Sequence, residues 1–294
     1  MCVDIIIPIY NAFEKLQRCL QSIYCHTNLT ENRLILINDK SSDMRIAPYL
    51  DNQMRDNIIV IHNNANKGFS NNVNLGMKQS ADRDVILLNS DTVVTERWVE
   101  KMVQCAYRDN SIGTVTPLSN NATICSVPRF CEENTLPEGI DIDQMAAIVE
   151  ECSLRKYPRI PVANGFCMYI KREVIDTIGD FDAGTFGRGY GEENDFCNRA
   201  EQGGYVHVMC DDTYIYHSGT QSFSTEEKMT YIKEHERILY ERYPKQMRKN
   251  AIYCKINPNG WVGRNISYHI SKYSKCSDRS QKSILDRFIT RLKK

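Results

Sequence analysis

Short apolar runs alternate with segments of helical periodicity over residues 3–115. The runs are near-continuous stretches of Val, Ile and Leu, which is typical of strands buried on both faces of a sheet. They cover residues 3–9, 34–37, 58–61, 85–88 and 112–115. Between them, apolar residues recur every three or four positions, which predicts helices at 13–23 (with Asn11 as N-cap), 71–80 and 96–107. The alternation indicates an α/β fold with a mostly parallel central sheet and helices on both faces.

A less regular stretch follows at 118–160, which contains several prolines and one predicted helix near 144–152. The regular patterns beyond it are strands at 166–170 and 214–217, a glycine-rich loop at 184–191 and a helix from about Glu192. The remainder has a helical pattern and is basic. We therefore expect one α/β domain at 1–223, followed by a helical C-terminal extension at 224–294.

Composition narrows the class of protein. Hydrophobic residues make up 41% of the chain and charged residues 25%, as in globular proteins. No apolar run reaches about 18 residues, so we expect no membrane-spanning helix, and the first residues lack the regions of a signal peptide. The twelve cysteines form no C-x-x-C pair, and several, such as Cys19, Cys167 and Cys197, lie in apolar patterns. We therefore expect a cytoplasmic protein with reduced, buried thiols, and the cysteine spacing gives no support for a zinc site.

The charges are unevenly distributed, although they sum to zero. Residues 1–222 contain 20 Lys and Arg against 30 Asp and Glu, and residues 223–294 contain 17 against 7. A basic tail on an acidic body suggests an anionic partner, such as the inner face of a membrane or another protein, rather than nucleic acid. Residues 282–294 have the pattern of a basic amphipathic helix, which would lie on a membrane surface or pack against protein.

Two of the predicted strands end in a carboxylate. Asp39 follows the strand at 34–37, and Asp91 follows the strand at 85–88. Ligands of open α/β sheets bind at the carboxyl ends of the strands, so both side chains are expected near a binding site. Asp39 could accept hydrogen bonds from a base or ribose, or form a polar turn. Asp91 could bind a divalent cation that neutralises a diphosphate, or cap the next helix.

Polar residues elsewhere add further candidates. Glu193 or Asp195, at the start of a helix after the glycine-rich loop, could act as a general base, although acidic residues are also common in a first helical turn. His217 ends the strand at 214–217, where an imidazole is either a metal ligand or a structural side chain. Tyr10 ends the first strand and could stack on a base or pack in the core.

Five segments together resemble the family 2 glycosyltransferases with the GT-A fold. The segments are Val3–Asn11, Ile37–Asp43, Asn66–Ser70, Asn74–Gly76 and Leu87–Thr92. The resemblance extends over about residues 3–223, and it depends on the order and spacing of the five segments. Asn89 stands where the family usually has the first Asp of a D-x-D motif. This Asn-Ser-Asp form is similar to a subgroup with rhamnosyltransferase-like members.

The resemblance implies roles for the matched residues. Asp39 would read the nucleotide base. Asp91 and His217 would bind a divalent metal, Mn²⁺ or Mg²⁺. Glu193 would be the catalytic carboxylate of the E-D motif, at a position where Asp is more usual, with Asp195 as its rival. The residues implied to bind the nucleotide are Pro8, Tyr10, Asn11, Asp39, Asn66, Gly68, Asn74 and Ser90.

The implied reaction is transfer of a hexose or deoxyhexose, with inversion, from a nucleotide-diphosphate sugar to a hydroxyl of a glycan or lipid-linked acceptor. Cell-surface polysaccharide synthesis is the expected setting, and we expect 118–160, 184–191 and the C-terminal extension to contact the acceptor. An inactive nucleotide-sugar-binding module is the alternative, and Asn89 is the feature that favours it. A nucleotidyltransferase is disfavoured, because residues 10–13 are not the glycine-rich basic loop that such an enzyme needs after its first strand.

Overall fold

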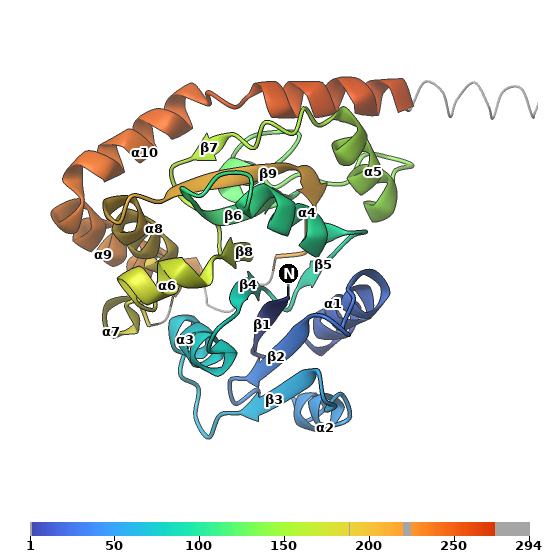
Figure 1. The fold of residues 1–294 in the computed structure, drawn as a ribbon, viewed down its shortest axis with the longest axis vertical. Coiled ribbons are helices and arrows are strands. Elements are labelled where there is room, and N and C mark those ends of the chain that lie inside the picture. The colour runs from blue at the N-terminus through green and yellow to red at the C-terminus, as the bar shows by residue number, and fades with distance from the viewer. Residues whose placement is uncertain (1, 188, 220–224, 274–294) are drawn as a thin grey trace, which may run out of the picture.

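The computed structural model of the protein describes residues 2–187, 189–219 and 225–273 (Figure 1). Within these residues, an eight-stranded sheet runs through the molecule. Its strand order is β3-β2-β1-β4-β8-β6-β9-β7. The strands are β1 (Val3–Ile9), β2 (Arg33–Asn38), β3 (Ile58–His62), β4 (Asp84–Leu88), β6 (Ile112–Leu118), β7 (Arg159–Ile160), β8 (Cys167–Ile170) and β9 (Val206–Tyr214). Strands β1 to β4 pair in parallel, whereas β8 runs antiparallel to β4 and β6. A separate antiparallel pair is formed by β5 (Thr92–Val93) and β10 (Tyr216–His217).

Helices cover both faces of the sheet. They are α1 (Phe13–His26), α2 (Ile46–Asp51), α3 (Phe69–Ser80), α4 (Trp98–Ala106), α5 (Ile142–Cys152), α6 (Arg172–Ile178), α7 (Ala183–Phe186), α8 (Glu192–Gln202), α9 (Thr225–Arg242) and α10 (Pro244–Ile256), with a 3₁₀ turn at Thr123–Cys125. Residues 261–273 are also helical.

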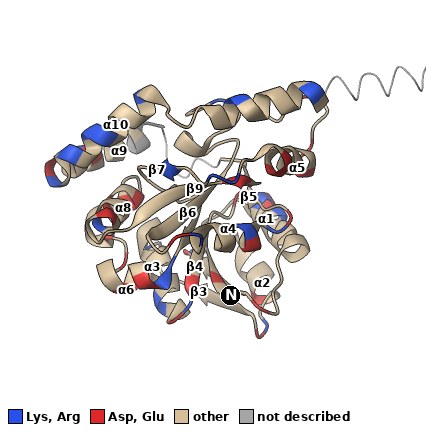
Figure 2. Cartoon of the chain, turned by 45° about the horizontal axis from the view of Figure 1, so that its top comes forward, with Lys and Arg blue, Asp and Glu red and all other residues tan. Residues whose placement is uncertain are grey.

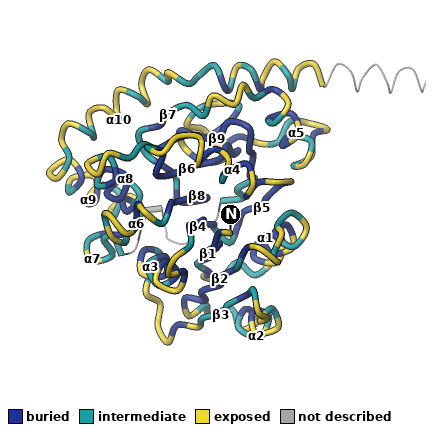
Figure 3. Tube along the Cα trace, viewed as in Figure 1, coloured by how far each residue is buried: buried dark blue, intermediate teal, exposed yellow. Residues whose placement is uncertain are grey.

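Successive side chains of a strand point to opposite faces, and this alternation divides the core in two. From β1, Ile5 and Ile7 pack with α1, α4 and α5 on one face, whereas Ile6 packs with α3, α6 and α8 on the other. Figure 3 shows the buried strands between helices whose outer sides are exposed. The predicted α/β architecture with a mainly parallel sheet is confirmed.

Most predicted elements of the first half are present within a few residues of their expected ends, and the helix expected near 144–152 is α5. The prediction of one continuous strand at 214–217 is wrong. Tyr214 ends β9, and Tyr216–His217 belongs to the separate pair. The sequence did not indicate β9, because buried polar residues interrupt its apolar pattern. These residues find their partners only in the fold: His207 Nδ1 lies 2.7 Å from Thr114 Oγ1, and Asp211 accepts from the Tyr157 amide.

Two smaller expectations are also corrected. Asn11 does not cap α1, because it has a left-handed backbone (φ 58°) and its side chain binds a neighbouring loop instead. Part of the expected glycine-rich loop is the short helix α7, which Asp182 caps by accepting from the Thr185 amide at 3.0 Å.

The predicted helical C-terminal extension is confirmed for its described part. Helices α9 and α10 and residues 261–273 run along the outside of the domain (Figure 1). Lys and Arg residues, blue in Figure 2, recur along α10. Within the described residues, no helix has the length and apolarity needed to cross a bilayer. The basic amphipathic segment expected at 282–294 lies outside the described residues.

Candidate active site

The strand pair β5 and β10 brings His217 to Asp91. Asp91 lies in the turn after β4, near the middle of the sheet, and Thr92 pairs with His217 across the two strands. The His217 Nε2 atom is 3.3 Å from Asp91 Oδ1. Ser218 reinforces the approach, because its amide and its hydroxyl both donate to the Asp91 carbonyl, at 3.0 and 2.6 Å. The two side chains predicted to bind metal are therefore adjacent.

The orientation of the His217 ring is fixed from three sides. Its Nδ1 donates to the Asn121 carbonyl at 2.7 Å, and its backbone amide donates to Asn120 Oδ1 at 2.8 Å. The ring of Phe166 stacks on it with centroids 5.3 Å apart. Because a carbonyl only accepts, Nδ1 carries the proton, and Nε2 is directed at Asp91.

The His217 imidazole titrates differently from an exposed one. Burial lowers its pKa, but the hydrogen bond and charge of Asp91, together with the Asn121 carbonyl, outweigh burial and raise the pKa above its ordinary value. Without a cation, the carboxylate therefore favours the charged form of the ring. With a cation, the same Nε2 and Oδ1 atoms are available as ligands.

A second carboxylate lies one short segment away. Gly165 donates its amide to Glu193 Oε1 at 3.1 Å, and a Cβ at Gly165 would lie only 2.5 Å from that oxygen. The next residue is Phe166, which stacks on His217 and accepts from the Asn89 amide at 2.8 Å. Residues 164–166 thus connect Glu193 to the Asp91–His217 pair. Burial raises the pKa of Glu193, which makes its carboxylate a stronger base than an exposed one.

Asp195, the other candidate base, lies in a different environment. Its carboxylate is 1% exposed and accepts from Arg199 Nε at 2.8 Å, Arg242 Nη1 at 3.0 Å and the Tyr243 hydroxyl at 2.8 Å. These contacts join α8 to α9 and the start of α10. Both residues lie on α8, but Glu193, and not Asp195, is hydrogen-bonded to the segment 164–166 that contacts His217.

The residues predicted to read the base lie at the ends of β1 and β2. Asp39 is buried and accepts from Asn63 Nδ2 at 3.0 Å and from the amides of Lys67 and Gly68 at 2.7 and 2.9 Å. Asp39 therefore fixes the loop before α3. Its Oδ1 accepts two of these hydrogen bonds, and its Oδ2 accepts only the one from Gly68. Asn11 Oδ1 accepts from the amides of Ser42 and Asp43 at 2.9 and 3.1 Å, which ties the two strand ends together.

The remaining predicted nucleotide ligands are distributed around these loops. Pro8 is half-buried in β1, and Tyr10 is 42% exposed, so the tyrosine does not pack in the core. Asn66 is exposed on the loop held by Asp39, and Ser90 is half-buried next to Asp91. Asn74 lies apart from them, because its side-chain amide exchanges two hydrogen bonds, of 2.8 and 3.0 Å, with the backbone of Phe181.

The pair of Asp91 and His217 fits a divalent cation in its chemistry. A carboxylate oxygen and an imidazole nitrogen are both ligands that Mn²⁺ accepts. The described residues contain no cluster of three or more His, Cys, Asp or Glu side chains that could enclose a metal ion. The other ligands would have to come from the phosphates of a nucleotide and from water, as is usual where a cation binds a nucleotide.

A family model for glycosyl transferase family 2 matches residues 4–179. The chain belongs to glycosyl transferase family 2. Among curated family relatives, poly-β-1,6-N-acetyl-D-glucosamine synthase of Staphylococcus epidermidis is 27% identical over 183 residues, which cover 61% of this chain and 42% of the relative. An uncharacterised glycosyltransferase of Haemophilus influenzae is 28% identical over 112 residues, 37% of this chain and 34% of the relative. The chain thus spans less than half the length of these relatives.

Solved glycosyltransferase structures share the GT-A fold of this family 2 chain. The mannosyltransferase PcManGT from Pyrobaculum calidifontis, in complex with GDP-Man and Mn²⁺, has a TM-score of 0.61 and 13% identity and covers 96% of this chain and 79% of its own. GalNAc-T7 with UDP, GalNAc and Mn²⁺ has a TM-score of 0.59 and 16% identity over 92% of this chain and 57% of its own. S. aureus TarS with UDP-GlcNAc has a TM-score of 0.55 and 14% identity, and the match covers 81% of this chain and 65% of the TarS chain.

The resemblance to family 2 that the sequence indicated is confirmed, but several residues of the site were not anticipated. Asn120 and Asn121 hold His217, Gly165 and Phe166 connect it to Glu193, and Lys15 Nζ donates to the Gly219 carbonyl at 2.7 Å. One signal was available for the first two, because this polar Asn pair closely follows a predicted strand. Nothing local marks the others.

Proposed function

We propose that this family 2 chain transfers a hexose or deoxyhexose from a nucleotide-diphosphate sugar to a hydroxyl of a glycan or lipid-linked acceptor, in cell-surface polysaccharide synthesis. The observation that carries the proposal is the Asp91–His217 pair, whose Oδ1 and Nε2 atoms are 3.3 Å apart, with Glu193 hydrogen-bonded to Gly165 on the adjoining segment. A cation-binding pair next to a partly buried carboxylate supplies the two functions that sugar transfer needs: neutralisation of the leaving diphosphate and removal of the acceptor proton.

Each side chain then has a defined task. Asp91 Oδ1 and His217 Nε2 would hold Mn²⁺ or Mg²⁺, which would supply positive charge to neutralise the departing diphosphate. Glu193 accepts the proton of the acceptor hydroxyl while that oxygen forms its bond to the anomeric carbon. Attack from the face opposite the departing diphosphate inverts the anomeric centre. We assign the base to Glu193 rather than Asp195, because Asp195 already accepts from three donors.

The nucleotide would lie across the ends of β1 and β2. Asp39 keeps acceptor capacity on its second oxygen, which can receive a base N–H. Exposed Tyr10 provides a face for stacking, and Pro8 and Asn11 line the same strand end. Asn66, Gly68 and Ser90 would contact the nucleotide from the neighbouring loops. We exclude Asn74 from this set, because its amide is bound to the Phe181 backbone.

The charge of the extension supports a cytoplasmic location with contact to the inner face of a membrane. Helix α10 carries Lys245, Arg248, Lys249 and Lys255 and no acidic residue. Anionic lipid headgroups attract such a segment, and each basic residue near the surface contributes about 1 kcal/mol.

The substitution Asp91→Ala tests the proposal. In the wild type, one of a panel of UDP-, GDP- and dTDP-linked sugars should raise thermal stability only with Mn²⁺, by about 2–3 kcal/mol at about a hundredfold excess over its Kd. Asp91→Ala should lose the Mn²⁺-dependent stabilisation and all sugar transfer, whereas the exposed control Asp56→Ala should keep both. Full activity of Asp91→Ala would refute the metal assignment.

The alternative function is an inactive nucleotide-sugar-binding module. The specific observation in its favour is Asn89, an amide where the family usually has a carboxylate. This module predicts Mn²⁺-dependent stabilisation by a nucleotide sugar without transfer or donor hydrolysis. If Asn89→Asp then created hydrolysis, the missing carboxylate would be the cause of the inactivity.

A further inference from the structure

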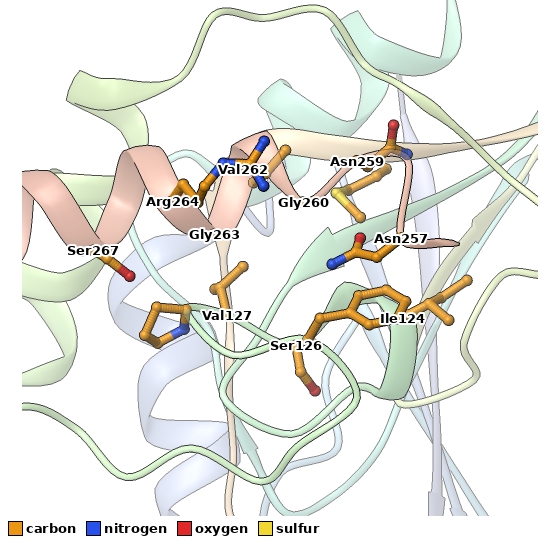
Figure 4. A pocket seen from close by; sticks show the side chains of 13 residues that line it. Ile124, Ser126, Val127, Asn257, Asn259, Gly260, Val262, Gly263, Arg264 and Ser267 are labelled. Atoms are coloured by element: carbon orange, nitrogen blue, oxygen red, sulfur yellow. The ribbon is translucent and has the colours of Figure 1, made fainter. Parts of the chain in front are cut away.

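A second hollow lies outside the site described above, between the loop that follows β6 and the C-terminal helix. Its volume is about 360 Å³. Ile124, Ser126 and Phe130 line it from the loop, and Asn257, Arg264 and Ser267 line it from the opposite side. In Figure 4 the helix that carries Gly263 and Ser267 passes above the loop that carries Ser126 and Val127. The wall therefore combines apolar surface with amide, hydroxyl and guanidinium groups.

Polar groups converge at one end of this cavity. A Cβ on Gly260 would lie 3.0 Å from Asn257 Nδ2 and 3.2 Å from Arg264 Nη1, so both groups approach the space that this glycine leaves free. Asn257 Oδ1 is buried and has no hydrogen-bond partner among the described residues. Arg264 is exposed, and no carboxylate in the described ranges pairs with it. The orphan amide oxygen requires a donor such as a hydroxyl, and the unneutralised guanidinium requires a negative group, so a hydroxylated anionic ligand would satisfy both.

The cavity wall is held by close packing. A Cβ on Gly263 would lie 2.3 Å from the Pro128 carbonyl oxygen, so only glycine allows the helix and the loop to approach this closely. On either side of Gly263, Val262 and Ile266 are 5% and 1% exposed and belong to the main core. The helix and the loop that line the hollow are therefore both anchored to the main core.

The loop that lines the cavity also borders the candidate active site. Asn120 and Asn121 hold His217. Thr123 Oγ1 accepts from Asn164 Nδ2 at 3.1 Å, and Asn164 directly precedes Gly165, the partner of Glu193. The first cavity residue, Ile124, follows Thr123 immediately. Neighbouring residues of one loop thus line the cavity and border the candidate active site.

We propose that this cavity is a distal acceptor subsite that binds an anionic sugar unit, one that bears a carboxylate or a phosphate. A sugar ring has an apolar face and a rim of hydroxyls, which match the apolar side chains such as Phe130 and the polar groups of Asn257, Ser126 and Ser267. Arg264 would pair with the negative group. The inference rests on the proposed glycosyl transfer, because only an acceptor-using enzyme needs such a subsite.

Sugar binding to the whole chain tests this subsite. Saturation-transfer NMR titrations would use glucuronate, glucose 6-phosphate and neutral glucose as probes. At least one charged sugar should bind with a Kd of roughly 1–10 mM, and the tighter of the two identifies the negative group. Ser267→Trp, which fills the cavity, should abolish binding. Arg264→Gln should weaken the charged sugar by about tenfold or more, to the level of glucose.

Matched variants and a donor measurement separate the outcomes. Ser271→Trp on the same helix and Arg248→Gln on α10 lie outside the cavity and should bind like the wild type. Unchanged binding in Ser267→Trp, or no binding of either charged sugar to the wild type, would overturn the subsite. Unchanged binding in Arg264→Gln would overturn its anionic specificity. Sugar transfer and donor hydrolysis with nucleotide sugars, measured in parallel, show independently whether the proposed glycosyl transfer fails.

Discussion

His217 and Glu193 have displaced pKa values for different physical reasons. In Glu193, burial disfavours the charged form and raises the pKa. In His217, burial acts in the opposite direction, but the Asp91 carboxylate outweighs it and raises the pKa. Because a proton on Nε2 excludes a cation from the same atom, protonation of His217 and metal binding compete.

As the pH is lowered, the affinity for metal should therefore begin to fall at a higher pH than it would with an ordinary imidazole ligand. The pKa of His217 lies above 6.5, so affinity should begin to fall at a pH above 6.5 and decrease further as the pH falls. Below the pKa, Mn²⁺ affinity measured by calorimetry with UDP should weaken by about tenfold per pH unit. His217→Asn should bind weakly with a flatter profile. A wild-type profile as flat as that of the variant would contradict this role.

Glu192, which directly precedes Glu193, should make the stability of the protein depend on pH. It is 3% exposed, and its Oε2 has no partner among the described residues. Burial, with the Glu193 charge, raises its pKa well above 4.5. The native state then holds a proton that the unfolded state releases, so the free energy of unfolding decreases as pH rises from about 4.5 through the raised pKa.

Glu192→Gln should remove the part of this dependence that comes from Glu192, since an amide mimics the neutral acid. Near neutral pH the variant should be more stable than the wild type by on the order of 1 kcal/mol, and the difference should shrink toward acid pH. Urea unfolding at several pH values measures it, with exposed Glu236→Gln as a control that should change little. A difference that grows toward acid pH would have the wrong sign.

At the scale of elements, the last residue of α9 secures the helix that carries Glu193. Arg242 Nη1 donates to Asp182 Oδ2 at 2.8 Å and to Asp195 Oδ1 at 3.0 Å, and its Nη2 donates to Thr185 Oγ1 at 2.8 Å. One side chain thus joins α9 to α7 and α8. Because Asp195 is buried two residues after Glu193, loss of this contact should affect both stability and the orientation of Glu193.

Arg242→Ala should lower the free energy of unfolding by about 1–3 kcal/mol, because Asp195 loses a charged donor in a buried position. The matched control is Arg237→Ala, earlier on α9. Its ion pair with Glu241 joins side chains that are 65% and 61% exposed, so its loss should cost at most about 0.5 kcal/mol. Equal losses in denaturant unfolding would show that the contacts of Arg242 contribute no more than a surface pair.

At the scale of the whole molecule, the C-terminal extension is part of the main core. Val262 and Ile266 are buried in the cluster that also contains β1 and α1, and Trp261 and Ile270 pack against it. The boundary expected between 223 and 224 lies outside the described residues. A shared core means that the extension and the α/β domain should unfold together rather than as separate units.

Ile266→Ala tests this coupling. The side chain is 1% exposed, so its truncation should cost about 2–5 kcal/mol in the single unfolding transition of the chain. Ile256→Ala removes the same atoms from a side chain that is 68% exposed and should change stability by at most about 0.5 kcal/mol. Similar small effects of both substitutions, or a separate early transition, would indicate an extension that folds independently.

The sequence by itself determined the strands and helices of the first half and the residue types of the candidate site. Apolar runs and helical periodicity are local signals, because each reports which side of one element is buried. The sequence also indicated the chemistry of Asp91, His217 and Glu193 and their places at the ends of elements. Both supported the family resemblance.

Only the tertiary structure decided how these residues meet. Ser218 and Asp91 are 127 positions apart in the sequence, and the pairing of β5 with β10 that joins them has no local signal. The preference for Glu193 over Asp195 came from partners on distant segments, Gly165 for one and Arg242 for the other. Strand β9 was missed for the same reason. A buried polar side chain is stable only where the fold supplies its hydrogen-bond partner, and a linear pattern does not contain that partner.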